Sequence, residues 1–303
     1  MDVKGKRVFV GLSGGVDSAV SAALLQQAGA QVTGVFIKGW YPPGMPCAWA
    51  AERRDAMRVA ARLHIPFETL DASAEYKQGV IDYLLAEYRA GRTPNPDVMC
   101  NREVKFGAFY RYAIDQGADA IAMGHYRRGE KDQSYFLWAV PKEILAKTLF
   151  PVGEMEKGEV RALAKHFNLP VAEKRDSQGI CFLGSVSVKD FLKSEIGDNP
   201  AILHTIGERV EGGYVVGKDI EKGTIEVASA LSGSHTIRFI NANHLADWSG
   251  FITAQYRYHG PLISGRVESD QFLPDTPTPE PVAPGQSIVF YRGDEHLGGG
   301  IIA

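Results

Sequence analysis

The sequence has few cysteines and no segment that resembles a membrane anchor. Its 303 residues include three cysteines, Cys47, Cys100 and Cys181, which are widely spaced and form no Cys-X-X-Cys pair. This pattern excludes the disulfide framework of a small secreted protein and argues against a zinc ribbon. No apolar run is long enough to span a bilayer, and the first residues do not form a secretory leader. We therefore expect a cytoplasmic protein without membrane contacts, whose cysteines are thiols unless they take part in chemistry.

The chain also lacks an excess of positive charge. Its formal net charge is −3, and its hydrophobic fraction of 45% and charged fraction of 23% are those of an ordinary soluble protein. Any RNA contact must therefore use local basic clusters rather than overall charge. Such clusters occur at Arg53-Arg54, at Arg127-Arg128 with Lys131, and at Lys174-Arg175. The length is sufficient for two or three domains.

The most informative motif lies near the N-terminus. Residues 8–10 (Val-Phe-Val) are typical of a buried strand, and residues 19–27 are typical of an apolar-rich helix. Between them, Ser13, Gly14 and Gly15 allow a tight turn that leaves backbone N–H groups uncovered. Uncovered N–H groups at the start of a helix, together with the helix dipole, favour an anion. The sequence therefore predicts a phosphate-binding loop.

This loop differs from two common phosphate-binding motifs. The lysine that follows the second glycine of a Walker A loop is absent, and the glycine spacing is not that of a dinucleotide-binding fingerprint. The string Ser13-Gly14-Gly15-Val16-Asp17-Ser18 resembles the pyrophosphate loop of the ATP-pyrophosphatases. Those enzymes adenylate an oxygen atom and release pyrophosphate.

Strands and helices alternate through the first two thirds of the chain. We expect further strands at residues 31–36, 67–70 and 119–123, and helices at residues 48–63, 74–90, 106–116 and 156–167. This order predicts an α/β fold with a doubly wound parallel sheet, whose ligand binds at the carboxyl ends of the strands. The glycine loop, Lys38 and His125 all follow predicted strands, so we expect them at that edge.

The character of the sequence changes at about residue 200. Short β-branched segments punctuated by glycine follow, with hairpin strands expected at residues 214–216 and 224–227. We predict three domains: an ATP-pyrophosphatase catalytic domain at residues 1–195, a small β-rich central domain at residues 196–232, and a C-terminal β-barrel at residues 233–303.

Two further segments each contain a cysteine. In Thr93-Pro94-Asn95-Pro96-Asp97-Val98-Met99-Cys100-Asn101, the prolines predict a stiff, extended loop that cannot be helical. A helix following Cys100 would favour its thiolate. In Lys174-Arg175-Asp176-Ser177-Gln178-Gly179-Ile180-Cys181-Phe182, the thiol lies close to basic residues. Taken singly, either cysteine could be a buried structural thiol, and Cys47, in a Pro-Gly loop, is expected to be one.

Taken together, these segments resemble the bacterial tRNA-specific 2-thiouridylases of the MnmA type. The resemblance extends over almost the whole chain and includes residues 11–18, 91–97, 100–101, 105–107, 124–126, 131–137, 176–182, 257–258, 284–286 and 297–300. The segments between Tyr126 and Lys131 and after Asp190 are shorter than is usual in the family. We therefore expect a shortened member.

The resemblance implies 2-thiolation of the wobble uridine in Lys-, Glu- and Gln-type tRNAs. ATP would adenylate the C2 oxygen of uracil, with Mg²⁺ spreading the phosphate charge and no certain protein ligand for the metal. Asp17 would be both a catalytic and an ATP-binding residue. The implied ATP site comprises Gly11, Leu12, Ser13, Gly14, Gly15, Val16, Asp17, Ser18, Ile37 and Gly124.

The resemblance also implies roles for the two matched cysteines. Cys181 would carry sulfur as a persulfide, supplied by a sulfur-carrier protein or a cysteine desulfurase. Cys100 would be the nucleophile that releases hydrosulfide or attacks directly, and the two cysteines would end as a disulfide. Asp97 would act as an acid or base, and Asn95, Pro96 and Asp97 would contact the extruded base.

Further positions match tRNA-contacting residues of the family. For Lys131 and Arg257 we expect contacts with phosphates, so binding should weaken with salt. The implied tRNA contacts are His125, Lys131, Asp132, Gln133, Arg257, Tyr258 and Gln286.

Other interpretations of the same residues remain open. An adenylating enzyme of the argininosuccinate synthetase or NAD synthetase type would use the same loop and need no cysteine pair. A non-catalytic tRNA-binding protein would retain the fold without releasing pyrophosphate. In a third variant the cysteines would hold an iron–sulfur cluster with Asp97 or another side chain, although such clusters usually have at least three thiolate ligands.

Overall fold

The computed structural model describes residues 2–42, 49–127, 132–175 and 187–303. The chain folds as two compact units, one drawn from residues 1–79, 100–134 and 140–185, the other from residues 80–99, 135–139 and 186–303. The three domain boundaries predicted from the sequence remain a prediction. Among the described residues, none of the helices combines the length and the apolar character that crossing a bilayer requires.

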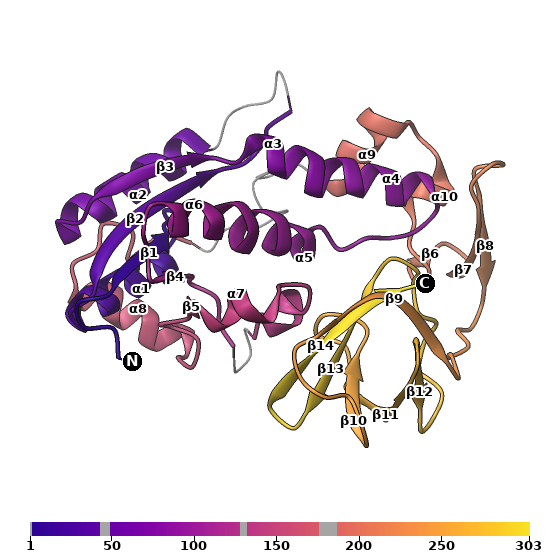
Figure 1. The fold of residues 1–303 in the computed structure, drawn as a ribbon. Helices are drawn as coiled ribbons and strands as arrows, with labels where there is room; N and C mark the ends of the chain where they lie inside the picture. The colour runs from indigo at the N-terminus through magenta and orange to yellow at the C-terminus, as the bar shows by residue number, and fades with distance from the viewer. Residues whose placement is uncertain (1, 43–48, 128–131, 176–186) are drawn as a thin grey trace. The chain divides into compact units, whose positions relative to one another are not determined.

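The first unit is built on a five-stranded sheet in which every neighbouring pair is parallel (Figure 1). The strand order is β3-β2-β1-β4-β5, so the predicted doubly wound sheet is confirmed. The two-residue strand β5 was not predicted, because so short a segment has no periodic pattern. The strands are β1 (Arg7–Gly11), β2 (Gln31–Lys38), β3 (Phe67–Asp71), β4 (Ala120–Ala122) and β5 (Thr148–Leu149).

The strand order reverses between β1 and β4. Val8 of β1 pairs with Ala120 of β4, and Val10 pairs with Ala122. β2 lies on the other side of β1. The sheet therefore grows to one side of β1 through β2 and β3, and to the other side through β4 and β5. In open α/β sheets such a switch point leaves a crevice at the carboxyl ends of the strands. The glycine loop follows β1 directly and is therefore located at the switch point.

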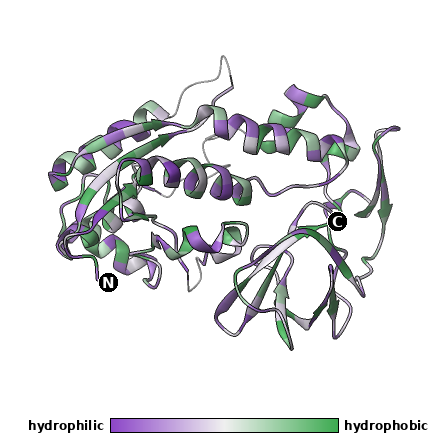
Figure 2. Cartoon of the chain, in the orientation of Figure 1, coloured by the Kyte–Doolittle hydropathy of each residue, from purple (hydrophilic) through white to green (hydrophobic). Residues whose placement is uncertain are grey.

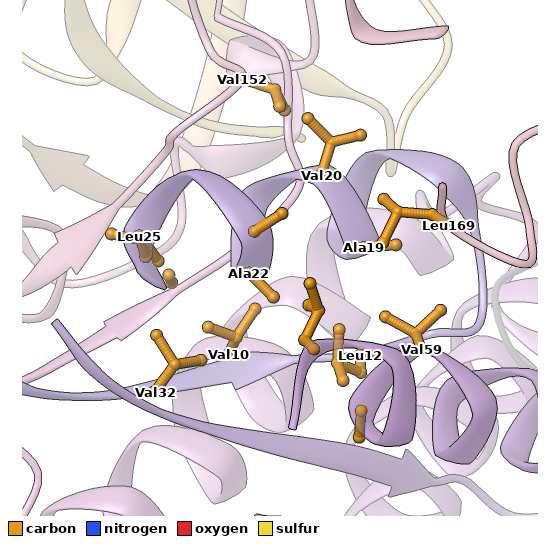
Figure 3. Close-up of a cluster of buried hydrophobic side chains, with 14 of the residues drawn as sticks. Val10, Leu12, Ala19, Val20, Ala22, Leu25, Val32, Val59, Val152 and Leu169 are labelled. Atoms are coloured by element: carbon orange, nitrogen blue, oxygen red, sulfur yellow. The ribbon is translucent and has the colours of Figure 1, made fainter. Parts of the chain in front are cut away.

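Helices cover both faces of the sheet. Helices α1 (Val16–Gln27), α2 (Trp49–Leu63) and α8 (Lys157–His166) share one apolar core with β1 and β2. Figure 3 shows part of that core, where Val10 of β1 and Leu12, just after β1, lie beneath α1 with its Val20, and Val59 of α2 lies beside Leu12. On the opposite face, α6 (Phe109–Asp115) packs on β4. This arrangement orients the start of α1 towards the edge where β1 and β4 end.

Two long helical segments each contain a π-helical stretch. The first runs through α3 (Ser73–Tyr76), η1 (Lys77–Asp82) and α4 (Tyr83–Arg89). The second runs through α5 (Pro96–Cys100), η2 (Asn101–Ala108) and α6. In Figure 2 these segments carry bands of both hydropathy colours, as helices with one buried side do.

The second helical segment corrects the prediction of an extended loop up to Cys100. The helix begins at Pro96, ten residues before the predicted start at Phe106. Proline is tolerated in the first helical position, since the N–H that it lacks would have no intrahelical acceptor there. Asn95 supplies the cap, because its Oδ1 accepts the N–H groups of Asp97 at 3.1 Å and Val98 at 3.3 Å.

The second unit contains two β modules. Strands β6 (Arg209–Val210), β7 (Gly213–Asp219) and β8 (Thr224–Ala228) form an antiparallel sheet, which confirms the predicted hairpin. Six antiparallel strands close into a barrel, as predicted, around aromatic side chains that include Phe239, Phe272 and Phe290. The barrel strands are β9 (Ile237–His244), β10 (Ile252–Gln255), β11 (Ile263–Glu268), β12 (Gln271–Pro274), β13 (Ser287–Arg292) and β14 (Glu295–Ile302).

Short helices connect these elements. In the first unit, α7 (Lys142–Ala146) precedes β5. In the second unit, α9 (Val188–Ile196) packs on α4, and α10 (Pro200–Leu203) follows it. The 3₁₀ turn η3 (Ser134–Leu137) carries two aromatic residues.

Candidate active site

The glycine loop joins the end of β1 to the start of α1. Gly15 is the N-cap of α1 in an extended conformation, and Asp17 lies in the first turn. The first N–H groups of any α-helix have no intrahelical acceptor, and the helix dipole adds partial positive charge at the same end. The structure therefore places a helix start, whose N–H groups and dipole favour an anion, at the switch point of the sheet.

Serine hydroxyls cover part of the loop backbone. Ser13 N–H donates to Ser18 Oγ, and Gly15 N–H donates to Ser13 Oγ, each at 3.3 Å. The two hydroxyls are 3.2 Å apart, and Ser18 Oγ also donates to the Gly15 carbonyl. The prediction that the loop leaves its N–H groups uncovered is therefore wrong for Ser13 and Gly15. Hydroxyls can rotate, so these contacts can be exchanged for contacts with a phosphate oxygen.

Gly14 is required by the backbone. Its φ of +75° lies in the left-handed region, and a Cβ there would overlap the carbonyl oxygen of Glu52 in α2. Any side chain at position 14 would therefore push the loop away from α2. Burial raises the pKa of the neighbouring Glu52 carboxyl, while the charge of Lys174 opposes this shift.

Asp17 is held by two side chains from other parts of the first unit. Its carboxylate accepts hydrogen bonds from Tyr126 Oη at 2.6 Å and from Lys157 Nζ at 2.7 and 2.9 Å. Tyr126 follows β4, and Lys157 is the first residue of α8. Three elements therefore converge on the first turn of α1. The result is a carboxylate and an ammonium group side by side at a predicted phosphate site.

Gly124, two residues after the end of β4, lies against the first turn of α1. A Cβ at this position would lie 2.8 Å from Ser18 N and 3.0 Å from the Asp17 carbonyl carbon. Both atoms belong to the helix backbone and cannot move independently. Gly124 is therefore needed for close packing of β4 against the start of α1. Ile37, the second predicted adenosine neighbour, is buried near the end of β2.

Two further lysines lie at the same edge of the sheet. Lys38 at the end of β2 pairs with Asp71 at the end of β3 at 2.7 Å, and this contact lowers the pKa of Asp71 to about 2. Lys174 Nζ donates to the Gly14 carbonyl at 3.0 Å and to Asp55 Oδ2 at 2.7 Å. Lys174 thus joins the glycine loop to α2.

His125 is buried in an aromatic pocket of the first unit. Its ring centroid lies 5.6 Å from that of Phe106 and 6.3 Å from that of Phe150. Burial, with a smaller contribution from the charge of Lys105, lowers the pKa of His125 to about 3. The ring is therefore neutral near pH 7. Any contact with tRNA would use it as a neutral hydrogen-bonding group rather than as a cation.

The predicted target-base residues lie at the start of α5. The Asn95 side chain caps the helix, Asp97 lies in its first turn, and both are partly exposed. Cys100 ends the same helix and is only 1% exposed. The structure therefore places Asp97 and Cys100 on one short helix that Asn95 caps, and chemistry at the thiol requires the thiol to become exposed.

Several predicted tRNA contacts make contacts within the protein. In the first unit, Asp132 Oδ1 accepts a hydrogen bond from Ser134 N–H. Gln133 Oε1 accepts from Tyr126 N–H, and Gln133 N–H donates to the Tyr126 carbonyl. In the second unit, Arg257 pairs with Glu280 at 3.0 Å, and the Tyr258 ring packs 4.4 Å from that of Phe136. Gln286 donates to the Thr93 carbonyl at 2.7 Å.

Three predicted positions lie outside the described residues. These are Cys47, Lys131 and Cys181. The predicted Cys100–Cys181 disulfide therefore remains a prediction, as do the persulfide and the phosphate contact assigned to Lys131.

Sequence reasoning missed the role of Lys157. The residue lies 140 positions after Asp17, and its local context is a capping box formed by Glu156 and Glu159. That pattern signals the start of a helix but does not indicate which element the first residue reaches.

Comparisons with known proteins place these features in a family. A family model described as the tRNA methyl transferase HUP domain matches residues 6–185, and one described as the aminomethyltransferase beta-barrel domain matches residues 234–302. The tRNA-specific 2-thiouridylase MnmA of Marinomonas sp. (strain MWYL1) is 41% identical over 362 residues, covering 98% of this chain and 91% of that protein. The same enzyme of Shewanella sp. (strain W3-18-1) is 40% identical over 360 residues, covering 98% and 96%.

The aligned spans are longer than this chain of 303 residues, so the relatives contain segments that it lacks. This confirms the predicted shortening. Among solved structures, the U34-tRNA thiolase NcsA from Methanococcus maripaludis with its 4Fe–4S cluster is 18% identical, with a TM-score of 0.41, and the match covers 67% of this chain and 71% of that one. The 41% and 40% identity to these 2-thiouridylases, over 98% of the chain, shows that the chain belongs to the MnmA family of tRNA-specific 2-thiouridylases.

Proposed function

We propose that this protein replaces the C2 oxygen of the wobble uridine by sulfur in tRNAs of the Lys, Glu and Gln type, at the expense of ATP. The observation that carries the proposal is its 41% identity, over 98% of its length, to a tRNA-specific 2-thiouridylase. The anion-binding start of α1 at the switch point of the sheet supports the use of a nucleotide. We place this activity in the cytoplasm.

The first step activates the base. The uracil C2 oxygen attacks the α-phosphorus of ATP, the bond between the α-phosphorus and the bridging oxygen breaks, and pyrophosphate leaves. The oxygen is then part of an AMP ester, which is a far better leaving group than the original carbonyl oxygen. The N–H groups of the first turn of α1 and Lys157 supply positive charge for the phosphates, while the backbone near Ile37 and Gly124 borders the adenosine.

The residues at the loop fit Mg²⁺ as the counter-ion of the triphosphate. Among the described residues, no group of three or more His, Cys, Asp or Glu side chains could hold a metal ion. Mg²⁺ commonly binds through one or two carboxylates with the remaining ligands from substrate phosphates and water. The carboxylate of Asp17, in the first turn of α1, is suited to that role. When bound, Mg²⁺ would offset the phosphate charge.

The second step transfers sulfur. Cys181 carries the sulfur as a persulfide, which a sulfur-carrier protein or a cysteine desulfurase supplies. In one route the Cys100 thiolate attacks Cys181 Sγ, the persulfide S–S bond breaks, and the released hydrosulfide attacks C2. In the other route the terminal sulfur attacks C2 directly, and Cys100 then displaces it from Cys181. Both routes expel AMP, form a Cys100–Cys181 disulfide and require a reductant before the next turnover.

The target uridine must leave the anticodon stack to reach these groups. Asn95, Pro96 and Asp97 at the start of α5 contact the extruded base, and Asp97 acts as an acid or base. The tRNA is held by His125, Lys131, Asp132, Gln133, Arg257 and Tyr258. Gln286 matches a further tRNA position of the family, although its amide is engaged with Thr93.

The proposal is tested by mass analysis of nucleosides. Unmodified tRNA is incubated with the protein, Mg²⁺, a sulfide source and ATP, and the digested nucleosides are examined for 2-thiouridine. We expect product with ATP and with its β,γ-imido analogue, which can still lose a pyrophosphate-like group, and none with the α,β-methylene analogue. With a cysteine desulfurase and cysteine in place of the sulfide source, product that forms equally well in a Cys100→Ser, Cys181→Ser double variant would contradict the sulfur-transfer step. Binding of tRNA without pyrophosphate release would contradict catalysis altogether.

A further inference from the structure

Lys174, the first residue of a basic pair with Arg175, reaches the glycine loop. Its Nζ donates to the Gly14 carbonyl at 3.0 Å and to Asp55 Oδ2 in α2 at 2.7 Å. All three residues belong to the first unit. The contact is partly buried, because the side chains of Lys174 and Asp55 are only 31% and 25% exposed. The lysine is therefore a fixed neighbour of the loop and not a solvated surface charge.

The contact acts on one peptide group, the one between Gly14 and Gly15. A trans peptide is planar, so its C=O and N–H point in opposite directions. While the Gly14 carbonyl is held towards Lys174, the Gly15 N–H faces the other way. It donates there to Ser13 Oγ, at 3.3 Å, within the loop. Lys174 thus sets the direction of an N–H group at the N-cap of α1.

The two glycines leave the orientation of this peptide open. Reversing it would carry the φ of Gly15 from −94° to a positive value, which glycine adopts about as readily as a negative one. The next peptide is held by the helix, because the Gly15 carbonyl accepts from Ala19 N–H and Ser18 Oγ, each at 3.3 Å. The Gly14 carbonyl is held by a side chain from a distant segment instead. The choice between the two orientations therefore depends on Lys174.

The two orientations differ in what they offer to an anion. In the observed one, the positive end of the peptide dipole faces the interior of the loop, as in other anion sites built from backbone N–H groups. In the reversed one, a carbonyl oxygen would face the interior and repel a phosphate. A loop with two glycines is flexible enough to adopt both, so its affinity for phosphates depends on the fraction of molecules in the observed orientation.

We propose that Lys174 is a positioning residue that holds the Gly14–Gly15 peptide in the orientation that binds the phosphates of ATP, rather than a residue that contacts phosphate or RNA. The proposal rests on the proposed function only for the identity of the anion. Its structural part, the direction of the Gly14 carbonyl in the nucleotide-free protein, stands independently of any reaction.

The structural part is tested with Lys174→Met, which keeps the aliphatic stem and removes the ammonium group. Crystal structures of the nucleotide-free wild type and variant show the direction of the Gly14 carbonyl. We expect it to face α2 in the wild type and to be reversed, in all or a large part of the molecules, in the variant. Lys174→Gln, which also lacks the charge, should give the same result and replaces Lys174→Met if melting temperatures show that the latter is unfolded.

The consequence for binding is measured by titration calorimetry with ATP. A hydrogen bond from a charged group shifts an equilibrium about tenfold or more, so Lys174→Met should bind ATP about tenfold more weakly. Arg58→Met is the matched control, because Arg58 pairs with the same Asp55, at 3.4 Å, from an exposed position on α2. It should bind ATP within about twofold of the wild type. Affinity for tRNA should change by less than about twofold in both variants.

Gly15→Ala separates positioning from direct contact with phosphate. Alanine tolerates the observed φ of −94° and ψ of 169°, but reversal would place it in a region that is disfavoured at least about tenfold for residues other than glycine. Its Cβ would lie 3.2 Å from Ser13 Oγ, the end of a side chain that can rotate. With Gly15→Ala as the reference, adding Lys174→Met should weaken ATP binding by at most about threefold. The Gly14 carbonyl of the double variant should face α2 again.

Four results overturn the inference. An unchanged carbonyl direction in Lys174→Met and Lys174→Gln shows that the lysine does not orient the peptide. A carbonyl that stays reversed in the double variant removes the argument from glycine flexibility. Equal losses of ATP affinity with glycine and with alanine at position 15 assign Lys174 to the phosphates, and a loss of tRNA affinity alone assigns it to RNA. By contrast, if the wild type binds no ATP but the Gly14 carbonyl reverses in Lys174→Met, the proposed function fails and the positioning role is supported.

Discussion

Lys157 Nζ lies 2.7 Å from Oδ1 of Asp17, although 140 residues separate the two in the sequence. Both side chains are partly buried, with exposed fractions of 17% for Lys157 and 29% for Asp17. The pair joins the first turn of α1 to the start of α8, where a nucleotide would bring both phosphates and a divalent cation. A metal ion at Asp17 would compete with the lysine, whose charge would then be available to the phosphates.

This pair leads to a prediction for Lys157→Met, which keeps the aliphatic stem and removes the charge. A hydrogen bond to a charged group contributes about 1.5–3 kcal/mol, so ATP affinity should fall roughly ten- to a hundredfold. AMP affinity should change little, because AMP lacks the two phosphates that the lysine would bind. Titration calorimetry with both nucleotides checks this. Lys165→Met, an exposed position on the same helix, is the control. Equal losses for ATP and AMP would contradict the assigned role.

Gly124→Ala should disturb the start of α1 without touching the loop sequence. The added Cβ would lie 2.8 Å from Ser18 N, a backbone atom that cannot move alone. We expect a loss of about 1–3 kcal/mol in the free energy of unfolding, as for other overpacked sites, and weaker ATP binding. Chemical denaturation provides the measurement. Gly158→Ala in the first turn of α8 is the matched control, because a Cβ there meets no heavy atom within 4 Å and should leave the free energy of unfolding nearly unchanged. A neutral Gly124→Ala would show that α1 and β4 pack less closely than the structure indicates.

Asp17→Ala should separate base activation from sulfur loading. We expect loss of ATP-dependent pyrophosphate release, because the loop loses its carboxylate. Persulfide loading of Cys181 should remain, since it requires neither the base nor the nucleotide. Pyrophosphate release and mass analysis of the Cys181 peptide give the two readouts. The simultaneous loss of both would show that the role of the loop is misassigned.

His125 should make the protein sensitive to acid. Its pKa of about 3 in the folded chain, set mainly by burial, compares with an ordinary value of 6.5. The unfolded chain therefore takes up this proton first, so the free energy of unfolding falls as pH decreases from about 6.5 towards about 3. Above pH 6.5 both states are neutral and this group contributes no pH dependence. Denaturation at several pH values should show a shallower acid slope for His125→Gln than for the wild type.

A large part of the first unit was predictable from local sequence. Buried strands with β-branched residues and a glycine turn before a helix are short-range patterns, so the parallel sheet and the glycine turn before α1 followed from residues close to one another. The prolines before Cys100 were misinterpreted, because the rule against proline in helices does not hold for the first helical position at Pro96. The helix that contains Cys100 therefore begins at Pro96, where an extended loop was predicted.

The sequence by itself determined the order of strands and helices, the glycine loop with Asp17 in the first helical turn, and the β character of the last hundred residues, since each depends on neighbours within a few positions. Tertiary structure alone decided that Lys157 and Tyr126 hold Asp17, and that Gln286 holds Thr93. Those contacts join segments more than a hundred residues apart. Their partners are selected by the packing of helices and strands, and no local pattern along the chain records that packing.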